Sequence, residues 1–128
     1  MFTAAMDVHN LAYAPYSGFK VSASILSSTL KIYSGINIEN AAYPQSQCAE
    51  ASAISSMILA GDNIIQEILI IGDGKLLCTP CGGCRQRLNE FRQGDVLVHV
   101  CGTEGLRKTF SLNELLPYSF GPSNLENL

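Results

Sequence analysis

Two short stretches carry the residues best suited to chemistry: Cys48-Ala49-Glu50 and Thr79-Pro80-Cys81-Gly82-Gly83-Cys84. Each has the character of a helix start, so three thiols and one carboxylate would meet at two helix N-termini. Helix N-termini favour the thiolate form of cysteine through their dipoles. This composition is typical of a zinc site that catalyses hydrolysis.

The Cys81-x-x-Cys84 pair alone is compatible with zinc binding, redox chemistry or chance. The order of elements does not match a thioredoxin-like redox protein. Cys78 extends the spacing toward that of an iron–sulfur site, but Thr79-Pro80 places it before the helix start. We therefore interpret Cys78 as a packing residue, and Cys101, within an expected strand, in the same way.

Cys48 makes the metal interpretation specific, because three cysteine ligands leave the fourth tetrahedral position of zinc for water. That arrangement is typical of catalytic rather than structural zinc. Zinc also makes water a nucleophile near neutral pH. Glu50 follows the ligand Cys48 by two positions, and is the candidate that takes and returns the proton.

Composition limits the class of protein. The 128 residues, 47% hydrophobic and 15% charged, predict a single compact domain over residues 1–128. A net charge of −3 without a basic run argues against a nucleic-acid polymer as partner, so we expect a small substrate. The sequence has no bilayer-spanning run and no secretory signal, which favours the cytoplasm. Five cysteines in a reducing compartment are not expected to form a disulfide framework.

Hydrophobic periodicity predicts an α/β fold, a three-layer sandwich with a mixed sheet of about five strands between helices. His9 lies off the apolar face of the first helix, so we expect it to be exposed. Thr79 and Pro80 are the expected N-cap and first residue of the third helix. In chain order the expected elements are a helix at Thr3–Ala14, strands at Lys20–Leu26 and Lys31–Ile36, a buried helix at Cys48–Ala60, a central strand at Ile64–Ile71, a helix from Thr79 to about Phe91, strands at Val96–Cys101 and Arg107–Phe110, and a capping box at Ser111–Glu114.

Two further segments allow a functional interpretation. The polar side chains of Asn37, Glu39 and Asn40 lie close together in one loop. They are consistent with turn chemistry, which the loop taken alone favours, or with a hydrogen-bonding wall for a hydroxylated ligand. The aromatic tail Tyr118–Pro122 is expected to contact another subunit.

At these residues the chain resembles the cytidine deaminases in their small homotetrameric form. Zinc deaminases carry a His/Cys-x-Glu motif followed by Pro-Cys-x-x-Cys, with a three-cysteine variant. Here Cys48-Ala49-Glu50 and Pro80–Cys84 match it, and Arg85-Gln86 follows. The similar segments outside the signature cover much of the remaining chain: Ala12–Ser17 with Phe19, Asn37–Pro44, Leu115–Pro117 and Phe120–Pro122.

The resemblance implies a hydrolase of pyrimidine salvage. It would convert cytidine and 2′-deoxycytidine to uridine and 2′-deoxyuridine with release of ammonia. One zinc ion per chain would be bound by Cys48, Cys81 and Cys84. Glu50 would deprotonate the water, protonate the base at N3 and then protonate the departing ammonia.

The resemblance also implies a set of nucleoside contacts, in a homotetramer whose active sites are completed across subunits. It favours ligand contacts over turn chemistry for Asn37 and Glu39. The implied contacts are Asn37 and Glu39 to the ribose 3′-hydroxyl, the Ala49 N–H to the base carbonyl, Phe19 against the base, and Tyr43 and Phe120 from neighbouring subunits.

Two positions depart from the family pattern. Ala51 stands where an arginine usually contacts the thiolates, which predicts a lower turnover or compensation by helix dipoles or Arg85. Ser22 replaces a usual glycine, and we expect it to affect packing only. Two alternatives remain: a related deaminase of another aminopyrimidine or a blasticidin-type antibiotic, and a non-catalytic zinc-binding homologue. The loop with Asn37, Glu39 and Asn40 suits a ribose and argues against the first alternative. Glu50 argues against the second.

Overall fold

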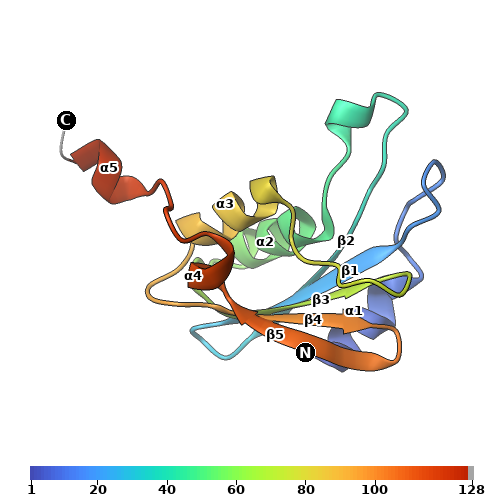
Figure 1. Cartoon of the computed structure of the whole chain (residues 1–128), viewed down its shortest axis with the longest axis horizontal. Helices are drawn as coiled ribbons and strands as arrows, with labels where there is room; N and C mark the ends of the chain where they lie inside the picture. The colour runs from blue at the N-terminus through green and yellow to red at the C-terminus, as the bar shows by residue number, and fades with distance from the viewer. Residues whose placement is uncertain (127–128) are drawn as a thin grey trace.

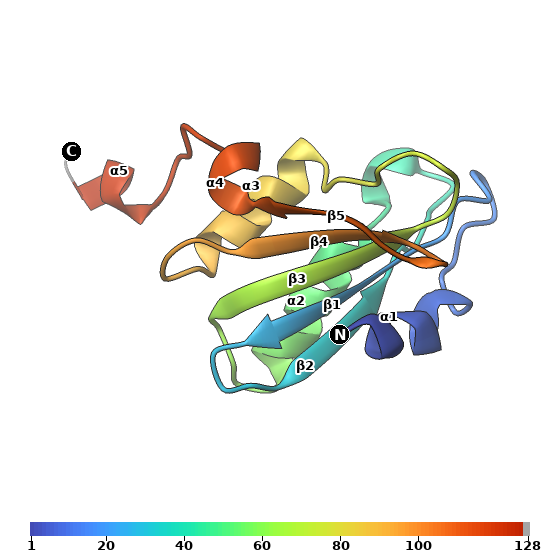
Figure 2. The same cartoon turned by 60° about the horizontal axis from the view of Figure 1, so that its bottom comes forward.

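The computed structural model describes residues 1–126, in which one five-stranded sheet lies between helices. The strand order is β2-β1-β3-β4-β5. The β3–β4 pair is parallel and the other pairs are antiparallel, so the sheet is mixed. Helix α1 lies on one face, and α2, α3 and α4 lie on the other (Figures 1 and 2). The predicted three-layer α/β fold is therefore confirmed.

The helices and strands follow the expected order, with two short additions, a 3-10 helix before α2 and a helix at the C-terminal end. The prediction of a single domain extended over residues 127–128, which lie outside the described residues. The elements are α1 (Phe2–His9), β1 (Val21–Ser27), β2 (Ile32–Ile36), the 3-10 helix η1 (Tyr43–Gln45), α2 (Ala49–Leu59), β3 (Ile65–Gly72), α3 (Gly82–Glu90), β4 (Leu97–Gly102), β5 (Gly105–Ser111), α4 (Leu112–Leu115) and α5 (Pro122–Glu126).

Helix α2 packs unusually close to the sheet, because Gly35 of β2 has no side chain. A Cβ atom at Gly35 would lie 2.2 Å from the backbone nitrogen of Ala53 and 2.5 Å from the carbonyl oxygen of Ala49. Behind this contact lies the larger apolar core, in which Met57 of α2 and Ile70 of β3 are fully buried. The close approach fixes the position of the α2 N-terminus, where Cys48 and Glu50 lie.

Helix α1 differs from its prediction at its end and in its buried face. It ends at His9 rather than Ala14. The backbone of Tyr13 instead bonds to that of Asn37 and Glu39, a pairing that needs extended rather than helical residues. The expectation that His9 is exposed was wrong. Its side chain is buried between the Ser22 hydroxyl, 2.8 Å from Nδ1, and the Asp73 carboxylate, 2.9 Å from Nε2.

Helix α3 begins later than predicted: its N-cap is Cys81 rather than Thr79, and Gly82 is its first residue. Strand β5 is also longer than expected. The predicted capping box is confirmed, with Ser111 and Glu114 bonding reciprocally at the start of α4. In residues 1–126, no helix combines the length and apolar character needed to cross a membrane.

Candidate active site

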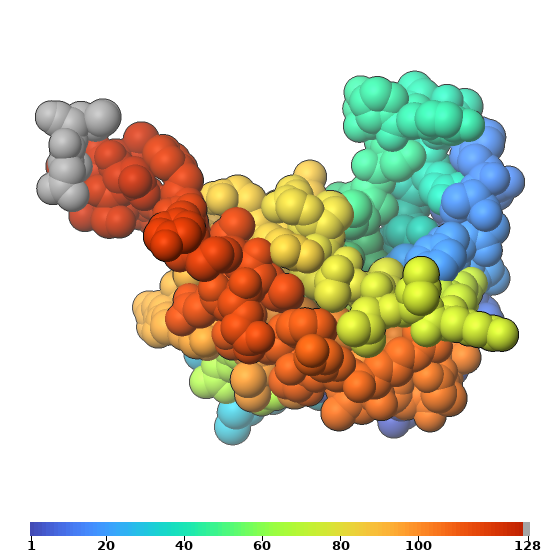
Figure 3. All heavy atoms as spheres, viewed as in Figure 1, coloured from blue at the N-terminus to red at the C-terminus, as the bar shows by residue number. Residues whose placement is uncertain are grey.

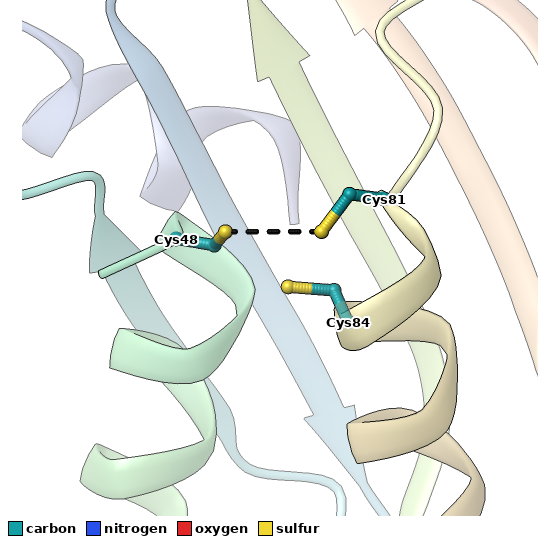
Figure 4. A group of neighbouring side chains, drawn as sticks. All are labelled: Cys48, Cys81 and Cys84. Carbon is teal, nitrogen blue, oxygen red and sulfur yellow. Dashed lines mark hydrogen bonds between the residues drawn. The ribbon is translucent and has the colours of Figure 1, made fainter. Parts of the chain in front are cut away.

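Three cysteine sulfur atoms meet between the N-terminal ends of α2 and α3 (Figure 4). Cys48 is the N-cap of α2, Cys81 is the N-cap of α3, and Cys84 lies in the first turn of α3. The Cys48 and Cys81 sulfurs are 3.9 Å apart, and all three sulfurs lie within 4.8 Å of one another. The predicted gathering of three thiols at two helix N-termini is therefore confirmed.

The thiol cluster fits zinc. A tetrahedral zinc ion with Zn–S bonds of about 2.3 Å places its sulfur ligands about 3.8 Å apart, close to the 3.9 Å between Cys48 and Cys81. Cysteine sulfur is also a ligand that zinc prefers. Cys78 and Cys101 do not belong to the cluster. The described residues thus supply three cysteine ligands, the number found with an open coordination position in catalytic zinc sites.

The thiols differ in acidity because they share a hydrogen bond. The pKa of Cys48 is lowered to about 6, mainly by its hydrogen bond with the Cys84 thiol and also by the Cys81 thiol and the Arg87 charge, against the opposing effect of burial. The same hydrogen bond with Cys48, together with burial, raises the pKa of Cys84. Cys48 is therefore the more acidic member of this pair.

The Glu50 carboxyl lies beside the thiols in the first turn of α2 and is only 5% exposed. Burial raises its pKa, and the nearby Cys48 raises it further, while its own backbone N–H, the Cys84 thiol and the Arg87 charge act in the opposite direction. A carboxyl group with a raised pKa can hold a proton closer to neutral pH, as a general acid and base requires.

A cavity of about 540 Å³ opens above the thiols and Glu50, within the size range of small-molecule pockets. In Figure 3 the surface is hollowed between the raised segment at residues 37–47 and the start of α3. The wall of the cavity also includes Cys78, which the sequence indicated only as a packing residue. Burial, followed by the Glu50 charge, raises the pKa of the Cys78 thiol to about 11.

The wall opposite the thiols contains the two polar residues expected there, Asn37 and Glu39. Asn37 Oδ1 accepts a hydrogen bond from the Val21 N–H at 2.9 Å, and Nδ2 donates to the Phe19 carbonyl oxygen at 2.9 Å. Glu39 accepts bonds from the Ser17 N–H at 3.0 Å and from the Ser17 hydroxyl. Hydrogen bonds from Ser17 lower the pKa of Glu39 and keep it ionised. Both residues therefore order this wall while lining the cavity.

The three aromatic residues expected around the substrate lie in different places. Tyr43 lines the cavity of its own chain, 71% exposed, with its ring edge-on to Tyr16. The Phe19 ring lies near Gly72 and Gly74 at the margin rather than among the lining residues. Phe120 is on the extension before α5, away from the cavity lining, where its carbonyl oxygen accepts a bond from Asn89 Nδ2 at 3.0 Å.

Sequence reasoning missed the basic residue that contacts the thiols. Arg85, the expected source of compensation for Ala51, directs its guanidinium to the Pro80 carbonyl oxygen at 2.7 Å and the Leu115 carbonyl oxygen at 3.0 Å. Arg87 Nη1 instead lies 3.5 Å from the Cys84 sulfur. The sequence signal that could have identified Arg87 is its position three residues after Cys84, since residues three apart on a helix share a face.

Comparison with known proteins agrees with this geometry. Residues 1–100 match the family model described as the cytidine and deoxycytidylate deaminase zinc-binding region. A cytidine deaminase of Sporosarcina psychrophila is 35% identical over 114 residues, which cover 89% of this chain and 84% of that protein. A crystal structure of cytidine deaminase from Burkholderia pseudomallei has a TM-score of 0.86 at 35% identity, covering 93% of this chain and 95% of that one. As its motifs predicted, the chain belongs to the cytidine and deoxycytidylate deaminase family with this zinc-binding region.

Proposed function

We propose that this protein is a zinc-dependent cytidine deaminase, which hydrolyses cytidine and 2′-deoxycytidine to uridine and 2′-deoxyuridine and releases ammonia. The observation that carries the proposal is the position of Glu50, buried in the wall of a small-molecule cavity beside three thiols. A purely structural metal site has no use for a carboxyl group there. Family membership supports the same reaction.

Cys48, Cys81 and Cys84 would hold the metal, one ion per chain. Zinc bound there supplies a Lewis acid that makes water a nucleophile near neutral pH. The two N-cap positions direct helix dipoles at the sulfurs and favour their ionised form. Ala49, the first residue of α2, has an N–H without an intrahelical partner, and this N–H meets the carbonyl oxygen of the base.

Glu50 moves the protons of the reaction. Its carboxylate takes a proton from the attacking water and delivers it to N3 of the cytosine ring as the C4–O bond forms. Glu50 then takes the second proton, from the hydroxyl group now bound to C4, and gives it to the amino group. The amino group leaves as ammonia when the C4–N bond breaks. The raised pKa of Glu50 suits both directions of transfer.

The wall opposite the thiols holds the sugar. Glu39 accepts bonds from the Tyr16 and Ser17 N–H groups through Oε1 and from the Ser17 hydroxyl through Oε2. A carboxylate has about four acceptor positions, so one remains for the ribose 3′-hydroxyl. Asn37 supports Glu39 at this hydroxyl. Phe19, whose ring lies outside the cavity lining in this structure, would pack against the base when the nucleoside is bound.

The working enzyme is a homotetramer in the cytoplasm, in which Tyr43 and Phe120 of neighbouring subunits close each cavity, in addition to the Tyr43 that lines the cavity of its own chain. The C-terminal extension supports this assembly, since α5 projects from the body of the chain (Figure 1). On this extension Tyr118 is 99% exposed and Phe120 55% exposed. Exposed aromatic residues that lie close together on such an extension favour an interaction site. Five free cysteines fit a reducing compartment.

The test compares the wild type with Glu50→Gln, following the loss of cytosine absorbance with cytidine as substrate and measuring zinc per chain. We expect deamination by the wild type and a loss of at least about 100-fold in kcat for the variant, because general acid–base catalysis contributes that much or more. Zinc content should stay equal, since an amide of the same size would leave the three thiols in place.

Other outcomes separate the alternatives. Turnover of a different aminopyrimidine or a blasticidin-type antibiotic, with none of cytidine or 2′-deoxycytidine, would show a related deaminase. Zinc binding without turnover of any of these would indicate a non-catalytic homologue. Light scattering of the purified chain checks the tetramer, which a monomeric mass would exclude.

A further inference from the structure

The thiol cluster carries excess negative charge, and α2 has no cationic side chain to offset it. Three thiolates exceed the two charges of a zinc ion, and the Glu50 carboxylate adds to the excess. Ala51, the next residue of α2, is buried and has only a methyl side chain. Sulfur ligands that retain their full charge donate strongly to the metal, and outer-shell hydrogen bonds to ligands tune metal sites.

One cation reaches the sulfurs from the opposite helix. Arg87 Nη1 lies 3.5 Å from the Cys84 sulfur, within reach for a donated hydrogen bond. Arg85 is not available for this role, because its guanidinium is bound to the carbonyl oxygens of Pro80 and Leu115. Among residues 1–126, Arg87 is the cationic side chain with a hydrogen bond to a cluster thiol.

The absence of a side chain at Gly83 leaves room for the Arg87 side chain along α3. A Cβ atom at Gly83 would lie 3.1 Å from Arg87 Nη1 and 4.0 Å from the Cys81 sulfur. The guanidinium therefore lies over the first turn of α3, against a residue without a side chain. A residue at Ala51 would approach the same sulfurs from α2.

We propose that Arg87 is a positioning residue of the deaminase reaction, donating a hydrogen bond to the Cys84 sulfur and so supplying from α3 the positive charge that Ala51 does not supply from α2. The inference rests on the proposed function. A hydrogen bond from a cation withdraws charge from the sulfur, and a ligand that donates less leaves the bound metal a stronger Lewis acid. The activity of the enzyme thus depends on an exposed side chain outside the ligand set.

The experiment replaces zinc with Co²⁺ in the full chain and records the thiolate-to-cobalt charge-transfer absorption of wild type and Arg87→Gln. Loss of the hydrogen bond raises the energy of the sulfur lone pairs, so these bands should move to longer wavelength. In the zinc form, kcat for cytidine should fall roughly tenfold, the size expected for one charge-assisted hydrogen bond. Arg87→Lys keeps the charge and should recover part of both effects.

The matched control is Arg92→Gln, which removes the same charge just after α3. Arg92 donates to Asn113 Oδ1 at 2.7 Å and pairs with Asp95, without contacting a sulfur. Its cobalt bands should coincide with those of the wild type. Equal bands in wild type and Arg87→Gln would overturn the inference, and so would an equal shift in the control.

The failures of the two proposals are distinguishable. A wild-type cobalt form without thiolate-to-cobalt bands would contradict the three-cysteine site itself, and the role of Arg87 with it. Wild-type bands without cytidine turnover would contradict the proposed function, while the band shift of Arg87→Gln would still decide whether Arg87 bonds to the sulfur.

Discussion

The two halves of the cavity are built in different ways. The metal half is formed by residues at the starts of α2 and α3, and the nucleoside half by loops. In the metal half Cys84 and Ala49 are fully buried and Glu50 is nearly so, with Cys81 exposed at the cavity. In the nucleoside half Tyr16, Ser17 and Tyr43 are all exposed. The metal half comprises Cys48, Ala49, Glu50, Cys81 and Cys84, and the nucleoside half Tyr16, Ser17, Asn37, Glu39 and Tyr43.

The difference follows from what each half must do. Ligand and proton-transfer groups have to be held within fractions of an ångström, which packing of helices on a sheet provides. The nucleoside must enter and leave, so we expect its contacts to lie on loops that keep one side open. The metal half should therefore respond to changes in the core, and the nucleoside half to changes in its own polar bonds.

Gly35→Ala should have the largest effect and should act on the metal half. The added Cβ would lie 2.2 Å from the Ala53 nitrogen, so α2 must move away from the sheet. We expect a loss of about 3 kcal/mol in the free energy of unfolding, as for severe overpacking, and a lower zinc content. Urea denaturation and zinc assay provide the two measurements.

Gly82→Ala is the control for Gly35→Ala, because a Cβ at Gly82 would have no atom within 4 Å. It should keep stability and zinc content close to those of the wild type. Equal stability of the Gly35 variant would show that α2 is not held by its contact with β2, and the contrast between the two halves would lose its basis.

Glu39→Gln should have the second-largest effect and should act on the nucleoside half alone. The amide oxygen can still accept bonds from the Tyr16 and Ser17 N–H groups at the Oε1 position, so the loop should keep its shape. The lost charge weakens the bond to the sugar hydroxyl. We expect KM for cytidine to rise about tenfold, the value of one hydrogen bond to a charged group, with kcat and zinc content little changed.

Steady-state kinetics on cytidine measure the split between KM and kcat. Glu104→Gln is the control, since Glu104 is an exposed carboxylate bonded to Arg107 outside the cavity. A fall in kcat at constant KM for the Glu39 variant would remove Glu39 from sugar binding and place it with the metal half.

The same division describes what could be predicted from the sequence. The thiols and Glu50 belong to two short motifs at helix starts, where local rules act over a few residues, and their gathering was predicted. Whether Asn37 and Glu39 order a loop or bind a ligand could not be decided from the loop alone. Their bonds run to residues 16–21, a contact between segments that periodicity does not reveal.

The errors near α1 and α3 have a similar cause. Thr79 and Pro80 are a sound local signal for a helix start, yet the backbone enters the helix only after Cys81. The Arg85 side chain bonds back to the Pro80 carbonyl oxygen, a contact within this entry that residue preferences do not encode. His9 is buried but lay off the apolar pattern because its hydrogen-bond partners, Ser22 and Asp73, are polar. A polar buried face has no hydrophobic periodicity.

Ser22→Ala gives the smallest expected effect and tests the support behind the nucleoside half. The prediction that Ser22 affects packing only did not include its bond to His9 Nδ1. Asp73 bonds both to His9 Nε2 and to the Lys20 N–H at 3.0 Å, so Ser22, His9 and Asp73 together link α1 to the start of β1. Ser22 is fully buried, so Ser22, His9 and Asp73 cannot act as a catalytic triad on a substrate that approaches from solvent.

Removing the Ser22 hydroxyl leaves a buried ring nitrogen of His9 without its partner, which costs about 1–2 kcal/mol of stability. Zinc content and kcat should stay constant, because Ser22 and His9 lie on the α1 face of the sheet, opposite α2 and α3. Ser55→Ala, which removes an exposed hydroxyl bonded to the Ala51 carbonyl oxygen, is the control and should cost less than about 0.5 kcal/mol. Urea denaturation with a parallel zinc assay measures both variants. A loss of zinc in the Ser22 variant would mean that the two faces of the sheet are coupled, and that the metal half does not depend on the packing of α2 and α3 alone.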